Sequence, residues 1–231
     1  MSTSVEVPGR YNGPPGTANG GYICGLLAAS APAAPGLLPS VTLLDPVPVG
    51  TPMQLSGNGS HTGLYLDERL LATVTGTRTP IPGPPPVTTT AARAASAGFL
   101  GHDGHPFPDC FVCGPRRTGD GLLLAPGAVG NGTVACTWTP AGSQGEPVAS
   151  EIVWSALDCP GGWTEDPRPR PAVLTQMSAE LLTPVVAGSE YAVVARRVAD
   201  HGRTFVNATG LFTASGTLIA KARALWTVVA A

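Results

Sequence analysis

The feature that most constrains the fold of this 231-residue chain is an internal repeat. Three patterns occur twice and in the same order: a turn that runs into an apolar segment, an apolar stretch that closes on Pro-Val, and a hairpin-like pair of short apolar runs. The paired segments are 18–29 with 148–158, 41–50 with 177–188, and 62–74 with 209–222. A repeated pattern of this kind builds the same supersecondary unit twice. The sequence therefore predicts two halves, each with one apolar helix, near 19–31 and 148–158, followed by three or more antiparallel strands.

A proline-rich segment separates the two halves. Residues 80–86 read Pro-Ile-Pro-Gly-Pro-Pro-Pro, which is typical of a stiff linker, and an alanine-rich stretch over 88–97 predicts a short helix after it. We therefore expect a first half over residues 1–80, a linker over 81–104 and a second half over 105–231. Glycine and proline are abundant, at 30 and 25 residues, but a mean hydropathy of +0.17 indicates a folded chain rather than a disordered one.

Charge and hydropathy exclude several classes of protein. The net charge is −2 and no basic stripe is present, so we expect no nucleic-acid partner. No apolar run approaches the roughly 20 residues of a membrane span, and the first residues show no signal-peptide pattern. Five cysteines, an odd number, favour the reducing cytoplasm over a disulfide framework. Self-association into a homo-oligomer is compatible with all of these features.

Three short motifs carry a resemblance to a known family. Residues 19–22 (Asn-Gly-Gly-Tyr) resemble the helix opening of thioesterase-like hotdog proteins. Residues 110–114 (Cys-Phe-Val-Cys-Gly), followed by Gly-Leu at 121–122, resemble a motif that precedes the first strand in such domains, and residues 156–158 (Ala-Leu-Asp) resemble the end of their central helix. The resemblance covers nearly the whole chain. It implies an α+β double hotdog, with two antiparallel sheets, separate or continuous, each wrapped around a central helix.

The same resemblance implies hydrolysis of an acyl thioester, either acyl-CoA or an acyl-carrier protein, without a cofactor. Such a reaction needs a carboxylate that activates water and N–H groups that stabilise the oxyanion. Asp158, at the end of an apolar helix, is the candidate carboxylate, with a structural alternative in which it bonds the 159–162 turn. Gly20 and Gly21, with Asn19 before them, are the candidate donors at a helix N-terminus, or merely a tight turn into a packed helix.

In the resembled proteins the glycine and the acid come from different hotdog units, which implies one site per chain between the two halves. Gly20 and Gly21 would pair with Asp158, whereas the reciprocal site would have Ala28 in place of the acid. Five further residues are candidate substrate contacts, each with an ordinary structural role as its alternative. They are Gln176 and Ser178 on a strand, Glu151 at the second helix start, and Arg116 and Arg117 as donors to CoA phosphates.

A metal site is the main competing interpretation of the cysteine motif. His102, His105, Cys110 and Cys113 form an H-x2-H-x4-C-x2-C pattern of zinc-type ligands. The resemblance instead assigns the cysteine pair to a loop, so we expect no metal, with a structural zinc as the less favoured alternative. No phosphate-binding glycine loop and no nucleophile elbow is present, so we also expect no nucleotide-type redox cofactor and no serine triad.

Two other functions remain open beside hydrolysis. A hotdog hydratase or dehydratase needs a histidine with an acidic partner at the helix, but His61, His102, His105 and His201 all lie outside the two expected helices. The second alternative is a non-catalytic protein that binds acyl thioesters. In this alternative the first half has lost its acidic residue and the second half has lost its catalytic role as well. Release of free thiol from a panel of acyl-CoAs separates hydrolysis from mere binding.

Overall fold

The structure is a computed structural model that describes residues 2–31, 34–57 and 61–229. Its helices are α1 (Gly20–Ser30), α2 (Thr89–Ser96) and α3 (Ser150–Gly162), with short 3-10 turns at Gly9–Tyr11 and Leu100–His102. The strands are β1 (Ser2–Val5), β2 (Leu38–Leu43), β3 (Met53–Gly57), β4 (Thr62–Leu66), β5 (Arg69–Thr77), β6 (Gly127–Gly130), β7 (Thr133–Trp138), β8 (Ala172–Leu181), β9 (Tyr191–His201), β10 (Thr204–Thr213) and β11 (Leu218–Val228). None of the helices described is both long enough and apolar enough to span a bilayer.

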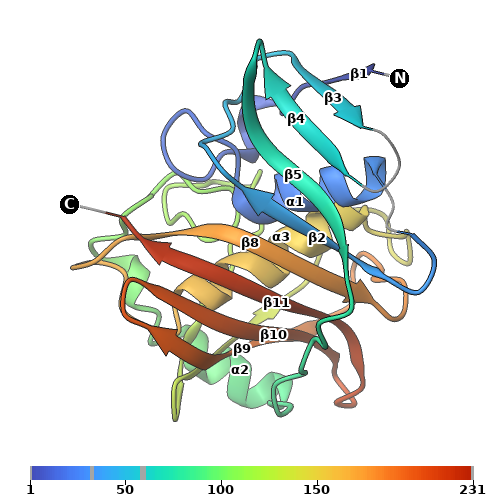
Figure 1. Cartoon of the computed structure of the whole chain (residues 1–231). Helices are drawn as coiled ribbons and strands as arrows, with labels where there is room; N and C mark the ends of the chain where they lie inside the picture. Colours follow the sequence, from blue (N-terminus) through green and yellow to red (C-terminus); the bar gives the residue numbers. More distant parts are fainter. Residues whose placement is uncertain (1, 32–33, 58–60, 230–231) are drawn as a thin grey trace.

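The eleven strands of the described residues form one antiparallel sheet, in the order β1-β3-β4-β5-β2-β8-β11-β10-β9-β7-β6. The N-terminal strands occupy one side of this order and the C-terminal strands the other. They meet where β2 pairs with β8, with Val41 opposite Met177. Figure 1 shows this junction at the middle of the curved sheet. The α+β class is therefore confirmed, and the sheet is continuous.

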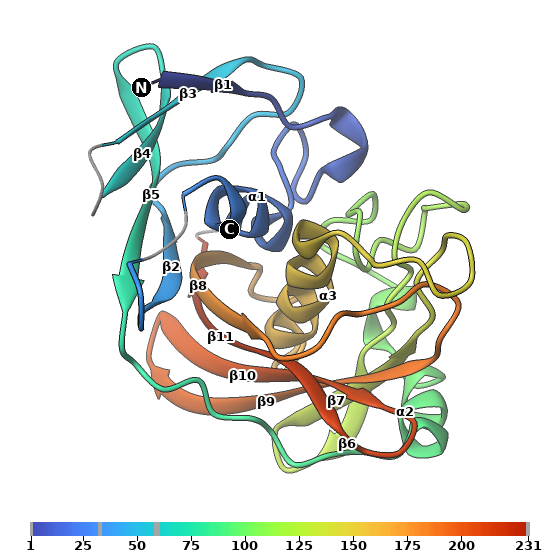
Figure 2. The same cartoon turned by 90° about the vertical axis from the view of Figure 1, so that its right-hand side faces the viewer.

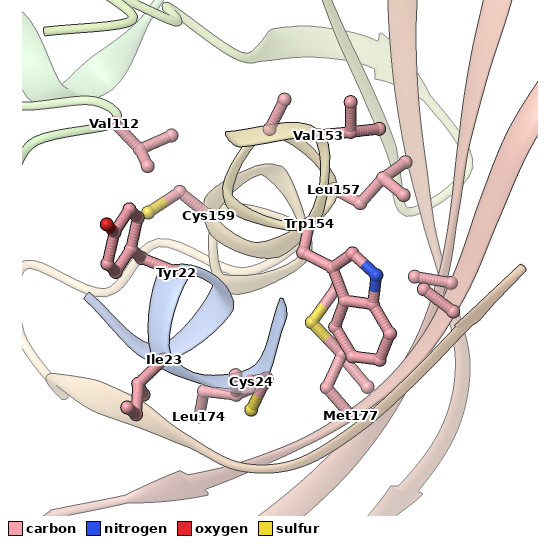
Figure 3. Packing of buried hydrophobic residues seen from close by; sticks show 14 of the residues in the cluster. Tyr22, Ile23, Cys24, Val112, Val153, Trp154, Leu157, Cys159, Leu174 and Met177 are labelled. Atoms are coloured by element: carbon pink, nitrogen blue, oxygen red, sulfur yellow. The ribbon is translucent and has the colours of Figure 1, made fainter. Parts of the chain in front are cut away.

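The two central helices lie side by side on the concave face of the sheet (Figure 2). They run in opposite directions and approach closely because glycines of α1 face α3. A Cβ on Gly21 would stand 2.5 Å from the Asp158 Cβ, and one on Gly25 would stand 2.6 Å from the Glu151 Cα. Figure 3 shows the buried side chains around this helix pair, including Trp154. The main apolar core thus forms between α1, α3 and the inner face of the sheet.

The segment between the halves carries the short helix that the sequence predicts. Helix α2 begins after Thr88, whose hydroxyl accepts the Ala91 N–H at 3.2 Å. Its buried residue Ala92 belongs to a second, small apolar cluster with Ala135 of β7. Because the next residue along β7, Cys136, belongs to the main core, α2 packs on the outer face of the sheet.

Helix α3 continues to Gly162, four residues beyond the end expected from the sequence, although Pro160 lies within its last turn. A proline at this position has no N–H to donate to the Ala156 carbonyl, yet the helix continues through Gly161 and Gly162. The Gly161 carbonyl at this buried helix end accepts from the Thr164 N–H and hydroxyl and from a buried side chain of β10. Asn207 donates its amide to the Gly161 carbonyl at 2.6 Å and accepts from Thr164 at 3.0 Å.

We expect Asn207→Ala to lower the free energy of unfolding by about 2 kcal/mol, because the Gly161 carbonyl would lose one of its donors and the Thr164 hydroxyl would lose its contact with the Asn207 amide. Urea denaturation followed by circular dichroism measures this change. Ser215→Ala, in an exposed turn, is the control and should change stability by less than about 0.5 kcal/mol. Equal stability of the two variants would contradict this role for Asn207.

Candidate functional site

The site forms where the N-terminus of α1 meets the C-terminal part of α3. Asn19 precedes α1 and caps it, since its side-chain oxygen accepts the Tyr22 N–H at 2.9 Å. The capped turn presents Gly21 directly to α3, where no side chain heavier than hydrogen fits. An asparagine cap followed by two glycines therefore brings a helix N-terminus against Asp158, 137 residues further along the chain.

The Asp158 carboxylate is held by donors from the opposite half. Its Oδ2 atom accepts the Gly21 N–H at 2.8 Å and the Asn19 amide at 3.2 Å. The side chain is 1% exposed. Burial raises the pKa of Asp158 to about 7, against the lowering effect of these two donors. Its second oxygen, Oδ1, has no hydrogen-bond partner among the described residues.

The Asp158 carboxylate faces α1 and not the 159–162 turn, so the structural alternative for this residue does not hold.

Most N–H groups of the first turn of α1 have an acceptor within the protein. Gly21 donates to Asp158, Tyr22 to the Asn19 side chain and Ile23 to the Asn19 carbonyl. The Gly20 N–H has no acceptor in the described part of the chain, and Gly20 lines the adjoining cavity. Gly20 is therefore the N–H donor at this helix terminus that is free to meet a ligand.

A cavity of about 310 Å³ adjoins these residues. It lies between both halves and is lined mainly by apolar side chains, at a volume near the lower end of small-molecule sites. Its lining includes Asn19, Gly20, Ile23, Leu43, Val47, His105, Phe107, Cys110, Cys113, Asp158, Cys159, Trp163, Leu174 and Trp226. An apolar chamber with one carboxylate and one helix N-terminus suits a ligand with a hydrophobic body and a single polar, carbonyl-like group.

Two of the expected substrate contacts on β8 lie away from this cavity. Gln176 donates to the Thr42 hydroxyl at 3.1 Å across the β2–β8 junction, and Ser178 pairs with Ser40 in the same junction. Neither lines the cavity. The sequence predicted the strand correctly, but the residue that points into the core there is Met177. Successive side chains of a strand point to opposite faces, so Gln176 does not share the face of Met177.

The charged candidates are also outside the cavity lining. Glu151 lies in the first turn of α3, at the other end from Asp158, and accepts a hydrogen bond from Ser150. Arg117 is engaged with the backbone carbonyls of Asp109 and Arg10 and with Asp120, so it joins two loops. Arg116 is exposed and lies 3.6 Å from Asp109, which leaves it accessible to a solvent-borne anion.

The structure brings together three of the four residues of the zinc-type pattern, since His105 Nε2 lies 3.3 Å from the Cys113 sulfur, and places His102 apart from them. His102 is exposed and packs edge-on against Phe99. Cys110 and Cys113 are buried, and the third member of their cluster is Cys159, from α3. Sequence reasoning missed Cys159 because it lies 49 residues from Cys110; its only local signal is its position directly after Asp158. It also missed the cavity side chains Trp163 and Trp226.

No protein-family model and no curated protein matches this chain. Solved structures do match over its whole length. A conserved protein of unknown function with a hot dog fold from Alicyclobacillus acidocaldarius matches with a TM-score of 0.62 at 15% identity, covering 100% of this chain and 94% of that one. The tesB protein of Mycobacterium avium subspecies paratuberculosis matches with a TM-score of 0.60 at 16% identity, over 99% and 93% of the two chains.

A candidate thioesterase II of Thermobifida fusca YX is equally similar, with a TM-score of 0.60 at 16% identity, over 99% of this chain and 92% of that one. Identities this low establish a fold and leave the activity to be argued from the site. With two central helices on one continuous antiparallel sheet, and with full-length likeness to a solved hot dog structure, this chain is a double hotdog protein.

Proposed function

We propose that this protein hydrolyses acyl thioesters at a single site between its two halves. The observation that carries the proposal is the buried Asp158 carboxylate, which is held through Oδ2 by Gly21 and Asn19 and keeps Oδ1 without a partner beside an apolar cavity. Burying a carboxylate costs stability, and carboxylates retained at that cost are typical of functional sites. The full-length likeness to two structures described as candidate thioesterases favours hydrolysis over other tasks for this carboxylate.

In the proposed reaction the acyl chain occupies the apolar cavity and the thioester carbonyl meets the Gly20 N–H. Asp158 takes a proton from a water molecule, whose oxygen attacks the carbonyl carbon. The carbon–sulfur bond then breaks, and the leaving thiolate receives the proton from Asp158. The products are a carboxylic acid and a free thiol. The positive end of the α1 dipole stabilises the oxyanion as charge develops on it.

The carrier of the acyl group is proposed to be CoA or an acyl-carrier protein, and the chemistry at the carbonyl is the same for both. No lysine or arginine occurs among the described residues that line the cavity, so the cavity itself suits the acyl group and not the phosphates. Arg116, exposed and held only by a loose ion pair with Asp109, is the proposed contact for a phosphate outside it.

One contact favours the alternative of a binding protein without turnover. The Gly21 N–H is already used by Asp158, so a single backbone donor, that of Gly20, is left for an oxyanion.

A hydratase is disfavoured by the surroundings of His105, the histidine in the cavity lining. Its Nδ1 accepts the Phe107 N–H at 2.9 Å and its Nε2 lies 3.3 Å from Cys113, so neither nitrogen is free to act as a base.

A panel of acyl-CoAs with short, medium, long and aromatic acyl groups tests the proposal, with a thiol-reactive dye as the readout. We expect catalytic release of CoA, fastest for acyl groups small enough to fit a cavity of about 310 Å³. Saturable binding of the same compounds without thiol release would support the binding-protein alternative. Neither binding nor release would exclude both functions for CoA esters.

Asn19→Ser separates the two roles of this residue. Serine still caps α1, but it lacks the amide that donates to Asp158. Loss of one hydrogen bond to a charged group costs about 1.5–3 kcal/mol, and we expect kcat to fall by about 10- to 100-fold with little change in KM. Unchanged kcat would show that the Asn19 amide does not position Asp158 for the reaction.

A further inference from the structure

A cluster of three buried thiols lies beside the proposed hydrolytic site and has no role in the reaction above. The sulfur atoms of Cys110, Cys113 and Cys159 all lie within 4.8 Å of one another. The Cys110 and Cys159 sulfurs are 3.7 Å apart. Ligands of a tetrahedral zinc–thiolate site, with Zn–S bonds of about 2.3 Å, have sulfurs roughly 3.8 Å apart. The cluster therefore already has nearly the dimensions of a metal site.

Hydrogen-bond donors point at the sulfurs from several directions. The Asn19 amide lies 3.6 Å from the Cys159 sulfur, and His105 Nε2 lies 3.3 Å from the Cys113 sulfur. Figure 3 shows the Cys159 side chain leaving α3 toward the segment that carries Val112. N–H donors directed at sulfur are the usual surroundings of metal-bound thiolates, which accept hydrogen bonds that tune the site.

The C-x-x-C turn brings the two loop sulfurs together. Its backbone folds back over the first cysteine, so that the Gly114 N–H donates to the Cys110 carbonyl at 2.9 Å. Such a turn leaves both sulfurs on the same side, toward α3.

The described residues that line the cavity beside the cluster supply no cation to balance thiolates. All three cysteines are buried, and no lysine or arginine occurs among the described residues of the cavity lining next to them. Metal binding would release the thiol protons, and the divalent ion would supply the charge that balances the buried thiolates. We propose that Cys110, Cys113 and Cys159 bind a single thiophilic divalent metal ion, with zinc as the ion that best fits a redox-inert, three-sulfur site.

His105 serves as a donor to this site and not as its fourth ligand. Its Nδ1 faces the Phe107 backbone N–H, which is a donor, so Nδ1 must be unprotonated. The imidazole proton therefore sits on Nε2 and points at the Cys113 sulfur. A metal bound at Nε2 would require Nδ1 to carry the proton, in conflict with the Phe107 N–H. The fourth position is left to a water molecule from the adjoining cavity.

Such an ion would hold two distant segments together. Cys110 and Cys113 belong to the loop that follows the linker, whereas Cys159 belongs to α3, next to Asp158. Metal binding would therefore fix this loop against the helix that carries the proposed catalytic acid. This role goes beyond thioester hydrolysis and revises the sequence-based expectation of a metal-free protein, since the third ligand comes from α3 and neither histidine is a ligand.

Metal content of the protein purified under reducing conditions and without chelators tests the proposal, independently of activity. Plasma mass spectrometry is expected to find about one zinc ion per chain in the parent and in Cys136→Ala, a buried cysteine outside the cluster. Cys159→Ala is expected to retain less than a tenth of that amount, because the two remaining cysteines alone bind zinc weakly. The parent is also expected to take up Co²⁺ after zinc removal and to show thiolate-to-cobalt charge-transfer absorption.

Three outcomes would overturn the proposal. The first is a fully reduced parent that contains no metal and takes up neither zinc nor cobalt. The second is a Cys110–Cys159 disulfide, detected by peptide mass spectrometry in freshly prepared protein, which would make the cluster a redox pair. The third is a folded Cys159→Ala protein with the metal content of the parent. The cobalt measurement on the parent decides the matter even where Cys159→Ala fails to fold.

Discussion

Replacing Asp158 with asparagine is expected to lower kcat for acyl-thioester hydrolysis by about 10²–10⁴-fold, the range for removal of a positioned acid–base group. Asparagine keeps a side-chain oxygen that can accept the Gly21 N–H, so the contact between α1 and α3 is retained. It cannot take a proton from water. Steady-state release of free thiol, at saturating acyl-CoA, measures the loss, and the melting temperature verifies that the variant folds.

Glu180→Gln is the matched control for this experiment. Glu180 is a carboxylate on β8 that is paired with Lys221 at 3.1 Å and is absent from the cavity lining, so turnover is expected to equal that of the parent. Parent-like turnover by Asp158→Asn would end the proposed mechanism. A large loss in Glu151→Gln instead would move the reaction to the opposite end of α3.

Gly21→Ala is expected to destabilise the protein by about 3 kcal/mol or more, because a methyl group there overpacks the tightest contact between the two halves. Its Cβ would stand 2.5 Å from the Asp158 Cβ and 2.7 Å from the Trp154 carbonyl oxygen. Neither neighbour is the flexible end of a long side chain, so α1 and α3 must move apart. Urea denaturation measures the loss.

The control for this substitution is Gly9→Ala. A Cβ at Gly9 meets nothing within 4 Å, so stability is expected to change by less than about 0.5 kcal/mol. If the two alanine variants are equally stable, then the helices are not held in contact at Gly21, and the hydrogen bond from Gly21 to Asp158 would lose its structural basis.

Helices α1 and α2 were predictable because their signals are local. Asn19 caps a helix over the next few residues, and α1 runs from Gly20 to Ser30 within the expected 19–31. The alanine-rich stretch after the linker likewise forms α2. The end of α3 was not predictable, since Pro160 signals a stop locally, whereas one of the donors to the helix end, Asn207, comes from the distant strand β10.

Only part of the candidate site could be predicted from local sequence signals. Asp158 stood out because a carboxylate is unusual in an apolar helix, whatever the rest of the chain does. The faces of Gln176 and Ser178 depend on the register between β2 and β8, which short apolar runs do not specify. The thiol cluster depends on a contact between Cys110 and Cys159 across 49 residues, and no local pattern contains both.

A crystal structure of Asp158→Asn with an intact acyl-CoA tests most directly whether the thioester lies between the two halves. We expect the acyl group in the cavity between α1, α3 and β8, with the carbonyl oxygen within hydrogen-bond distance of the Gly20 N–H and the carbonyl carbon next to residue 158. An acyl group bound at the N-terminus of α3, near Ser150, or a carbonyl turned away from both Gly20 and residue 158, would contradict the proposed site.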